Sequence, residues 1–441
     1  MRNIFGTMKV RGGVKVEHNK FTNDCETVKM PVPSSVLIPL QQHIGAPCDS
    51  LVAKGDYVTV GQKIGDSKAF VSAPVHSSVS GVVKDIKTVF QNNGVAVNSI
   101  EIQSDSNQEV YDGIKPADDL NGNKLVDAVR ESGIVGLGGA GFPTSVKLTP
   151  PAGKIIDTII INGAECEPYI TSDYREMLEN PKYIFEGAKL LMQLFKVDNC
   201  IIAIENNKPA AIEKMTGLSS EYNGIKVLSI KTMYPQGAEK QLITTITGRK
   251  VPSGGLPADV GVLVHNVNTV SFIAKYVETG MPLISRRVTV AGGAVKNSMN
   301  VEVPIGTSLK DLFDFCGGFV EQPYKILIGG PMMGIAQHSL ESVVTKTTNA
   351  VLALTQKQCC ISDEYNCIRC GKCVDACPMN LMPLNINILS VKGRYEETLD
   401  YNVNDCIECG CCSYVCPAKR HLVQSIKLAK AEVKKLSNKQ K

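Results

Sequence analysis

Two stretches of the sequence carry cysteines at one repeated spacing, C-x2-C-x2-C-x3-C-P. They read CIRCGKCVDACP (367–378) and CIECGCCSYVCP (406–417). A tight loop can present three thiolates to the corners of an iron–sulfur cubane, and the fourth thiolate must then come from elsewhere in the chain. The repeated spacing therefore predicts two [4Fe–4S] clusters, which pass single electrons.

The same motifs predict which cysteines share a cluster, because in the bacterial two-cluster arrangement the last cysteine of each motif ligates the other cluster. The expected sets are Cys367, Cys370, Cys373 with Cys416, and Cys406, Cys409, Cys412 with Cys377. Cys411, Cys359 and Cys360 are out of register and are expected to be bystanders. Structural zinc is the alternative, but it would leave half of the eight cysteines idle and gives no role to Pro378 and Pro417.

The distribution of cysteines favours metal ligation over disulfides. The chain has 441 residues and 16 cysteines, of which five precede residue 350 and eleven lie within 359–416. The stretch MRNIFGTMKVRGGVKV lacks the apolar core of a signal peptide, and no apolar run reaches the roughly 18–20 residues of a membrane helix. We therefore expect a cytosolic chain. A formal net charge of +4 decides nothing about nucleic acid, and no nucleic-acid partner is expected.

A glycine-rich stretch, GLGGAGFPTS (136–145), is the second candidate site. Gly136, Gly138 and Gly141 have the GxGxxG spacing of a dinucleotide-binding loop. A Rossmann loop joins a strand to a helix, whereas this stretch follows a predicted helix and precedes a predicted strand. Lys147 comes shortly afterwards and is a cation for a phosphate held by backbone N–H groups. The stretch therefore predicts a phosphate cradle of another kind.

Polar side chains also follow an apolar strand. INGAECEPYITSDYRE (161–176) brings Asn162, Glu165 and Glu167 to the carboxyl end of that strand, where ligand sites of α/β sheets form.

The hydrophobic pattern predicts the elements that position these residues. Alternating residues at 30–105 predict a small β-sandwich or barrel, and the polar stretch 104–123 a linker. Strands then alternate with helices, which predicts an α/β layer structure: helices at 125–134 and 182–195, strands within 154–168 and at 200–205. Residues 285–335 return to β signals.

Several of these motifs resemble a known family. GLGGAGFPTSVK, INGAECEP, MYPQGAEKQLITTITGR (233–249) and VGVLVHNVNTV (260–270) look like the flavin-binding motifs of the NADH-oxidising flavoprotein subunit of respiratory complex I, and 285–320 resembles its β-grasp segment. With LIPLQQHIGAP (37–47), SAPVHSSVSG (72–81) and the cysteine motifs, the chain resembles the C subunits of Rnf electron transport complexes from residue 30 to about 425.

The resemblance implies roles for individual residues. Those that would hold the phosphate, ribityl chain or ring of FMN are Gly136, Gly138, Gly139, Gly141, Lys147, Asn162, Glu165, Asn266 and Thr269. Glu167 and Glu239 would lie where the family binds NAD(H), the substrate, and are the candidate catalytic residues. The sequence departs from complex I at Ala164, Ala238 and His265. These differences bear on the implied NAD(H) contacts more than on the implied flavin contacts.

The resemblance also implies an architecture. It is multidomain α/β and β, with a lipoyl-like β-barrel, an FMN/NADH-binding α/β domain, a β-grasp domain and a two-cluster ferredoxin domain. The expected boundaries are 1–115, 120–280, 285–340 and 355–425, followed by a basic tail at 426–441.

The implied function is that of a peripheral NAD(H)-reacting subunit of a membrane-bound ferredoxin:NAD oxidoreductase coupled to Na+ or H+ translocation, on the cytoplasmic face of the membrane. Its partners would be other subunits of the complex, one of them a ferredoxin-like iron–sulfur subunit. Two alternatives are a soluble cobalamin reductase of flavo-iron–sulfur type and a non-catalytic iron–sulfur relay.

Overall fold

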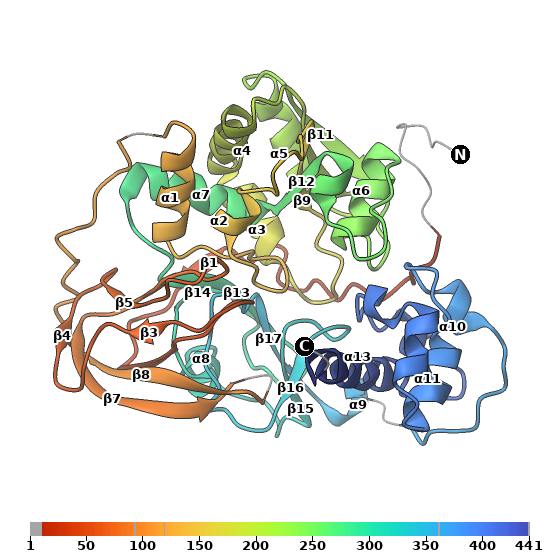
Figure 1. Ribbon diagram of the computed structural model, residues 1–441. Coiled ribbons are helices and arrows are strands. Elements are labelled where there is room, and N and C mark those ends of the chain that lie inside the picture. The colour runs from red at the N-terminus through yellow and green to blue at the C-terminus, as the bar shows by residue number, and fades with distance from the viewer. Residues whose placement is uncertain (1–10, 92–93, 119, 360–361, 440–441) are drawn as a thin grey trace.

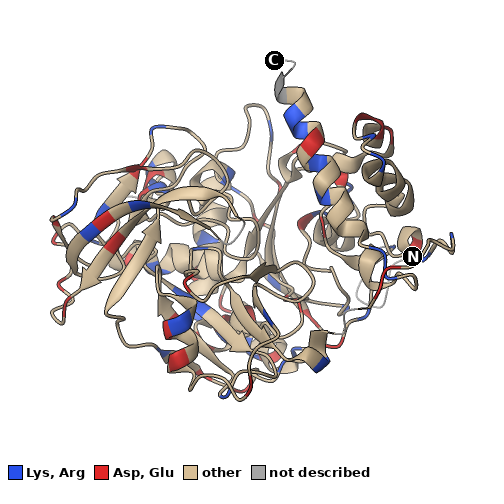
Figure 2. Ribbon diagram, turned by 90° about the horizontal axis from the view of Figure 1, so that it is seen from below, with Lys and Arg blue, Asp and Glu red and all other residues tan. Residues whose placement is uncertain are grey.

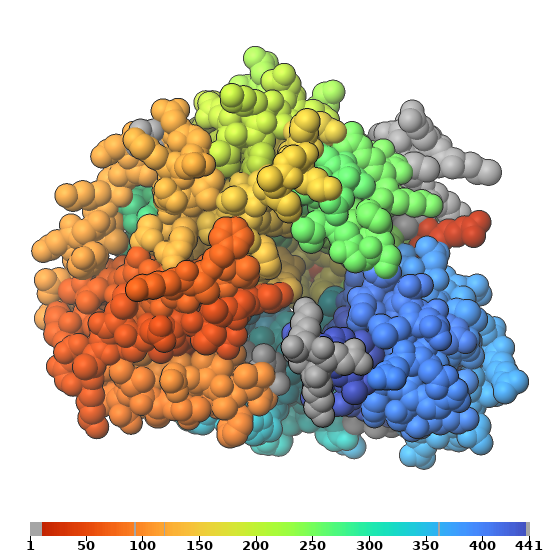
Figure 3. Space-filling model, viewed as in Figure 1, coloured from red at the N-terminus to blue at the C-terminus, as the bar shows by residue number. Residues whose placement is uncertain are grey.

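The computed structural model describes residues 11–91, 94–118, 120–359 and 362–439. Figure 1 shows a β-rich unit in red and orange, a helix-covered sheet in yellow and green, a second mixed sheet in teal and a helical unit in blue. The space-filling view shows these units packed against one another (Figure 3). Cys360, expected to be a bystander, lies outside the described residues.

The first unit is built from short strands in two sheets. One sheet has the order β2-β8-β7-β4 and the other β3-β5-β6. The strands are β2 (Ser35–Pro39), β3 (Asp49–Ser50), β4 (Tyr57–Val58), β5 (Lys63–Asp66), β6 (Val75–His76), β7 (Gly81–Phe90) and β8 (Ala96–Ser104). Alternate residues such as Ile38, Ile64 and Ile100 form the core between the sheets, as the alternating pattern predicts.

The second unit is a parallel sheet in the order β11-β10-β9-β12. Its strands are β9 (Thr158–Gly163), β10 (Cys200–Glu205), β11 (Ile225–Ile230) and β12 (Val262–Asn266). Its helices are α1 (Asn123–Glu131), α2 (Thr144–Lys147), α3 (Ser172–Glu179), α4 (Pro181–Phe195), α5 (Pro209–Ser219), α6 (Glu239–Thr247) and α7 (Val267–Thr279), with a 3-10 turn η1 (Pro257–Val260).

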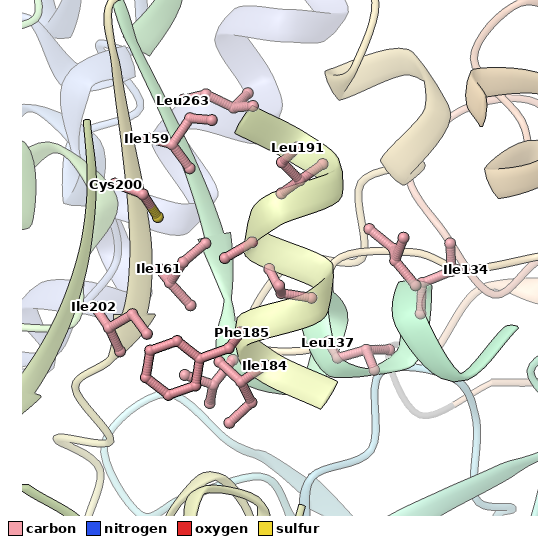
Figure 4. Close-up of a cluster of buried hydrophobic side chains, with 14 of the residues drawn as sticks. Ile134, Leu137, Ile159, Ile161, Ile184, Phe185, Leu191, Cys200, Ile202 and Leu263 are labelled. Atoms are coloured by element: carbon pink, nitrogen blue, oxygen red, sulfur yellow. The ribbon is translucent and has the colours of Figure 1, made fainter. Parts of the chain in front are cut away.

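Helices cover both faces of this parallel sheet. Ile159 and Ile161 of β9 pack with Phe185 of α4 on one face (Figure 4). Ile160 packs with Leu242 of α6 on the other face. A strand buried on both faces reads as a continuous β-branched run, which explains the IIING sequence of β9.

The third unit is a six-stranded mixed sheet in the order β1-β14-β13-β17-β15-β16. Its elements are β1 (Thr27–Lys29), β13 (Ser285–Ala291), β14 (Met299–Pro304), α8 (Leu309–Phe315), β15 (Lys325–Ile328), β16 (Ile335–Gln337) and β17 (Ala350–Leu354). The sheet therefore extends beyond the expected range 285–340. It gains β17 in its centre and β1 at its edge, because strand pairing joins segments that local sequence patterns do not relate.

The fourth unit contains both cysteine motifs. Its elements are α9 (Gln356–Cys359), α10 (Lys372–Asp375), α11 (Pro383–Val391), η2 (Glu396–Tyr401), η3 (Val403–Asp405), α12 (Cys411–Tyr414) and α13 (Leu422–Lys439). Each motif enters a one-turn helix, α10 or α12, and a longer helix follows.

The expectation of a separate basic tail is corrected by the structure. The boundary at residue 426 falls inside α13, and Ile426, Ala429 and Val433 are buried in the core of the fourth unit. Basic and acidic residues form bands along the helix (Figure 2). The apolar stripe of an amphipathic helix explains the packing, and residues 440 and 441 lie outside the described part of the chain.

Residues 11–30, which we term the N-terminal strap, lie outside the first unit although they precede it in the sequence. Gly13 donates its N–H to the carbonyl of Ala376 at 2.9 Å, and Val14 forms an antiparallel bridge with Tyr234. The strap then ends in β1, which pairs with β14. It thus contacts the fourth, second and third units in turn.

Candidate functional site

The structure brings the eight predicted cluster cysteines to two cavities, four to each. The first cavity is lined by Cys367, Cys370, Cys373 and Cys416. The second is lined by Cys377, Cys406, Cys409 and Cys412, and also by Cys411. Each cavity therefore takes three cysteines from one motif and the last cysteine of the other, which is the crossed arrangement that the spacing predicts.

The chemistry of these cavities fits iron–sulfur clusters. Four of the predicted ligand thiols line each cavity, and a [4Fe–4S] cluster is held by four cysteine thiolates. Backbone N–H groups point at the sulfurs, as at Cys377 Sγ, 3.3 Å from Leu381 N, and at Cys406 Sγ, 3.4 Å from Glu408 N. Such contacts tune cluster potentials.

The two cavities differ in exposure. Cys367 and Cys370 of the first set are exposed, whereas Cys377, Cys409 and Cys412 of the second set are buried. Burial raises the pKa of the Cys412 thiol to about 12. Bound metal must therefore supply the positive charge that makes this thiol a thiolate.

The second cavity faces the parallel-sheet unit. The Tyr234 hydroxyl donates to the Cys409 carbonyl at 2.7 Å, and Cys411, fully buried, packs in the same cluster of side chains as Tyr234, Cys166 and Met332. Cys411 is thus part of an inter-unit contact, a role that its position out of register did not predict.

The glycine stretch forms a loop over the N-terminus of α7. A Cβ at Gly138 would lie 2.5 Å from Asn266 Nδ2, and Gly141 has φ +69°, so both positions require glycine. Gly139 has open space around it, and a Cβ at Gly136 would make ordinary van der Waals contact with the backbone of Phe142. Leu137 N donates to Thr269 Oγ1 at 3.0 Å. Thr269 is fully buried and therefore supports the loop from beneath.

The ends of the parallel strands bring the remaining predicted residues together. Asn162 on β9 is paired in register with Asn266 on β12. Asn162 Nδ2 donates to the Gly237 carbonyl at 2.9 Å, which ties the strand end to the segment before α6. Asn266 Nδ2 donates to Asp173 Oδ2 at 2.7 Å, an acid that the sequence reasoning missed.

Lys147 and Glu239 form an ion pair, with Nζ and Oε1 2.5 Å apart. Their side chains are 28% and 37% exposed, so both are accessible to a ligand. The structure thus places the expected phosphate cation beside one of the two acids expected at the NAD(H) site. Burial and the nearby Lys147 lower the pKa of His265 well below its ordinary value, which keeps the imidazole neutral.

Glu165 is buried and Glu167 is half-buried beyond the end of β9, and loss of solvation raises the pKa of each to about 7. Glu165 Oε1 accepts from Asp173 N at 2.7 Å, at the start of α3. Glu167 accepts from Met332 N at 3.1 Å and Met333 N at 2.9 Å, in the third unit.

The site contains buried polar atoms that have no hydrogen-bond partner among the residues the structure describes. They are Thr144 Oγ1, Glu165 Oε2 and His265 Nε2. Buried polar groups are nearly always paired, so these three fit a polar ligand in the site. With the glycine cradle and Lys147, they match the needs of a flavin mononucleotide.

A cavity of about 520 Å³ opens beside the glycine loop, a volume typical of cofactor sites. Of the predicted residues, Gly138, Gly139 and Glu167 line it, and Lys147, Asn162, Asn266 and Glu239 do not. Its other walls come from residues 41–44, 91 and 95 of the first unit, residues 140 and 170 of the second, and residues 328–330, 333–335, 345, 347 and 349 of the third. The stretch LIPLQQHIGAP contributed to the family resemblance, but nothing in its sequence pattern assigned these walls a role.

Four family models match the chain in sequence. They are described as the RnfC barrel sandwich hybrid domain (8–107), the Nuo51 FMN-binding domain (129–275), the SLBB domain (287–336) and the 4Fe-4S dicluster domain (366–419). The predicted fold class and the predicted flavin and iron–sulfur domains are thereby confirmed. Fold and site define an iron–sulfur flavoprotein.

Curated relatives cover nearly the whole chain. The C subunit of the proton-translocating ferredoxin:NAD(+) oxidoreductase complex of Clostridium ljungdahlii is 46% identical over 96% of this chain and 93% of the relative. The C subunit of the Na(+)-translocating complex of Acetobacterium woodii is 44% identical over 97% of each. The C subunit of the ion-translocating oxidoreductase complex of Rhodobacter capsulatus is 39% identical over 97% of this chain and 83% of the relative. The chain belongs to the family of Rnf C subunits.

Among solved structures, an NAD+-reducing [NiFe]-hydrogenase has a TM-score of 0.48 at 17% identity, covering 72% of this chain and 61% of the other.

No helix in the described part of the chain combines the length and apolar character that a membrane crossing needs.

Proposed function

We propose that this chain is the peripheral, NAD(H)-reacting electron-transfer subunit of a membrane-bound ferredoxin:NAD+ oxidoreductase that moves Na+ or H+, and that it sits on the cytoplasmic face. The names of its relatives support the complex and its reaction. They do not favour the cobalamin-reductase or relay alternatives. Ferredoxin-like and membrane-bound partner subunits follow from the same proposal.

The observation that carries the proposal is the contact between the flavin unit and the second cysteine set. Tyr234, Cys166 and Met332 pack against Cys409 and Cys411, so the deeper cluster site adjoins the loop that carries Glu167. In the first cysteine set, Cys367 and Cys370 are exposed. We therefore assign the deeper site to electron exchange with the flavin and the exposed site to exchange with a partner.

Different residues of the chain would bind FMN and NAD(H). FMN supplies the conversion between a two-electron hydride and single electrons. The glycine loop and Lys147 would hold its phosphate, and Asn162, Glu165 and Asn266 would orient it. Glu167 and Glu239 would contact NAD(H), with Glu167 fixed by two N–H groups of the third unit.

An anaerobic preparation tests the proposal. The purified chain should contain FMN and iron for two clusters, and NADH should reduce first the flavin and then the clusters. An electron acceptor that reacts with flavin should be reduced even after the clusters are removed by substitution. A folded, flavin-loaded protein that NADH does not reduce would contradict the proposed function.

A further inference from the structure

A lysine from the N-terminal strap is inserted beneath the turn that carries Glu165 and Glu167. Lys20 Nζ donates to the carbonyls of Glu165 at 2.9 Å and Glu167 at 2.8 Å, and also to that of Ile170. Its side chain is only 8% exposed. Three carbonyls converging on one ammonium reproduce the coordination of a bound monovalent cation.

The turn needs such a ligand because it cannot satisfy itself. Tyr169 within it has φ +68°, a region that side-chain-bearing residues rarely adopt. Two further strap contacts hold it, from Tyr169 N to the His18 carbonyl at 2.9 Å and between the Thr22 and Thr171 hydroxyls at 2.6 Å. Without the ammonium, the carbonyls of Glu167 and Ile170 would lose this donor, and the Glu165 carbonyl would keep only a contact of 3.5 Å from Lys208 Nζ.

The neighbouring cation Lys208 makes a different set of contacts from Lys20. Lys208 Nζ is 3.0 Å from Glu205 Oε2 and is committed to that buried acid. It is 3.5 Å from the Glu165 carbonyl. Lys20 Nζ lies 3.9 Å from Glu165 Oε2, the carboxylate oxygen that accepts no hydrogen bond from the described residues. Lys20 therefore reaches both the backbone of the turn and the acid that faces the site.

We propose that Lys20 is a positioning residue of the flavin and nicotinamide site, whose ammonium holds the 165–170 turn so that Glu165 and Glu167 meet the ligands in the right place. The expected effect of Lys20 on NADH oxidation rests on the proposed function. Its expected effect on FMN binding rests only on the presence of the flavin domain.

The test compares K20A with K29A, since Lys29 is an exposed lysine of the same strap. In K20A, affinity for FMN and kcat/KM for NADH with an artificial acceptor should each fall about tenfold or more, the size expected when hydrogen bonds to a charged group are lost. Iron content should not change, and K29A should match the unaltered protein. Propylammonium should restore K20A, while tetramethylammonium, which has no N–H donor, should not.

Each contrary result overturns the proposal. If K20A binds FMN and oxidises NADH as well as K29A does, the turn keeps its conformation without the Lys20 ammonium. A loss that propylammonium leaves unrepaired, together with loss of iron, would show a general structural role. If K20A does not fold, K20R decides: a planar guanidinium cannot take the place of a compact ammonium among three carbonyls, so KM for NADH should rise, and unchanged kinetics would reject the inference. If the unaltered protein binds FMN and does not oxidise NADH, the proposed function fails, and the FMN titration still decides the role of Lys20.

Discussion

Tyr234 donates its hydroxyl proton to the backbone carbonyl of Cys409 at 2.7 Å, across the boundary between the parallel-sheet unit and the cysteine-rich unit. Both residues are buried. The bond therefore fixes the deeper cysteine set relative to the strand-end loops of the flavin unit, and it does so at one of the predicted cluster ligands.

Replacing Tyr234 by phenylalanine should disturb the deeper cluster selectively. The change leaves the Cys409 carbonyl buried without its donor, at a cost of about 1–3 kcal/mol. We expect a lower thermal midpoint and a shifted reduction potential of the deeper cluster, with the exposed cluster unaffected, as measured by potentiometric titration with electron paramagnetic resonance detection. Y222F is the control, because the Tyr222 hydroxyl bonds Glu186 away from the clusters. Equal shifts of both clusters, or of neither, would count against the inter-unit contact.

Cysteine substitutions should separate ligands from bystanders. Cys377 lies in the first motif but lines the second cavity, so C377A should lose the cluster of the second motif. C411A should keep both clusters and lose only packing, a cost of about 1–2 kcal/mol for a small buried side chain. Iron analysis and electron paramagnetic resonance check both results. Loss of the first-motif cluster in C377A would show that the sets are not crossed.

Substitutions of Lys147 and Glu239 should affect different ligands, FMN in the first case and NADH in the second. Their pair is partly exposed, so breaking it should cost no more than about 1 kcal/mol in stability. K147M should weaken FMN binding by about tenfold, because a charge-assisted contact to phosphate is lost. E239Q should keep FMN and raise KM for NADH. Flavin titration and steady-state kinetics distinguish the two, and K154M, at an exposed lysine paired with Asp259, is the control. Equal effects of K147M and E239Q on FMN would place both residues at the flavin.

The raised pKa of Glu167 should appear in the pH dependence of stability. Burial raises this pKa from the usual 4.5 to about 7, so the folded state favours the protonated acid. Its contribution is complete below about pH 4.5 and is lost as pH rises through 7. Between these values the unaltered protein should lose roughly 2–3 kcal/mol relative to E167Q, which cannot ionise.

Thermal unfolding at several pH values measures this difference. E167Q carries a fixed penalty, because an amide can accept only one of the two N–H bonds from Met332 and Met333, but that penalty does not vary with pH. Parallel pH profiles for the two proteins would contradict the raised pKa.

The cysteine spacing predicted the two sets of four cysteines that line the two cavities, because three thiols within one tight loop are a matter of local chain geometry. The apolar periods likewise determined the β-rich unit, the parallel sheet, the position of Asn162 near the end of β9 and that of Glu165 and Glu167 beyond it. These features depend on neighbours in the sequence, so a single sequence displays them.

Only the tertiary structure decided what lies across the site. Lys20 reaches the turn at 165–170 from about 145 positions away, β1 and β17 join a sheet whose other strands lie between 285 and 337, and residues 41–44 wall the cavity beside the glycine loop. The local sequence of these segments does not indicate which part of the chain each one contacts. These contacts form only when the units pack together. A buried lysine needs carbonyl acceptors, and an added strand needs a free strand edge, and in this chain both lie far away in the sequence.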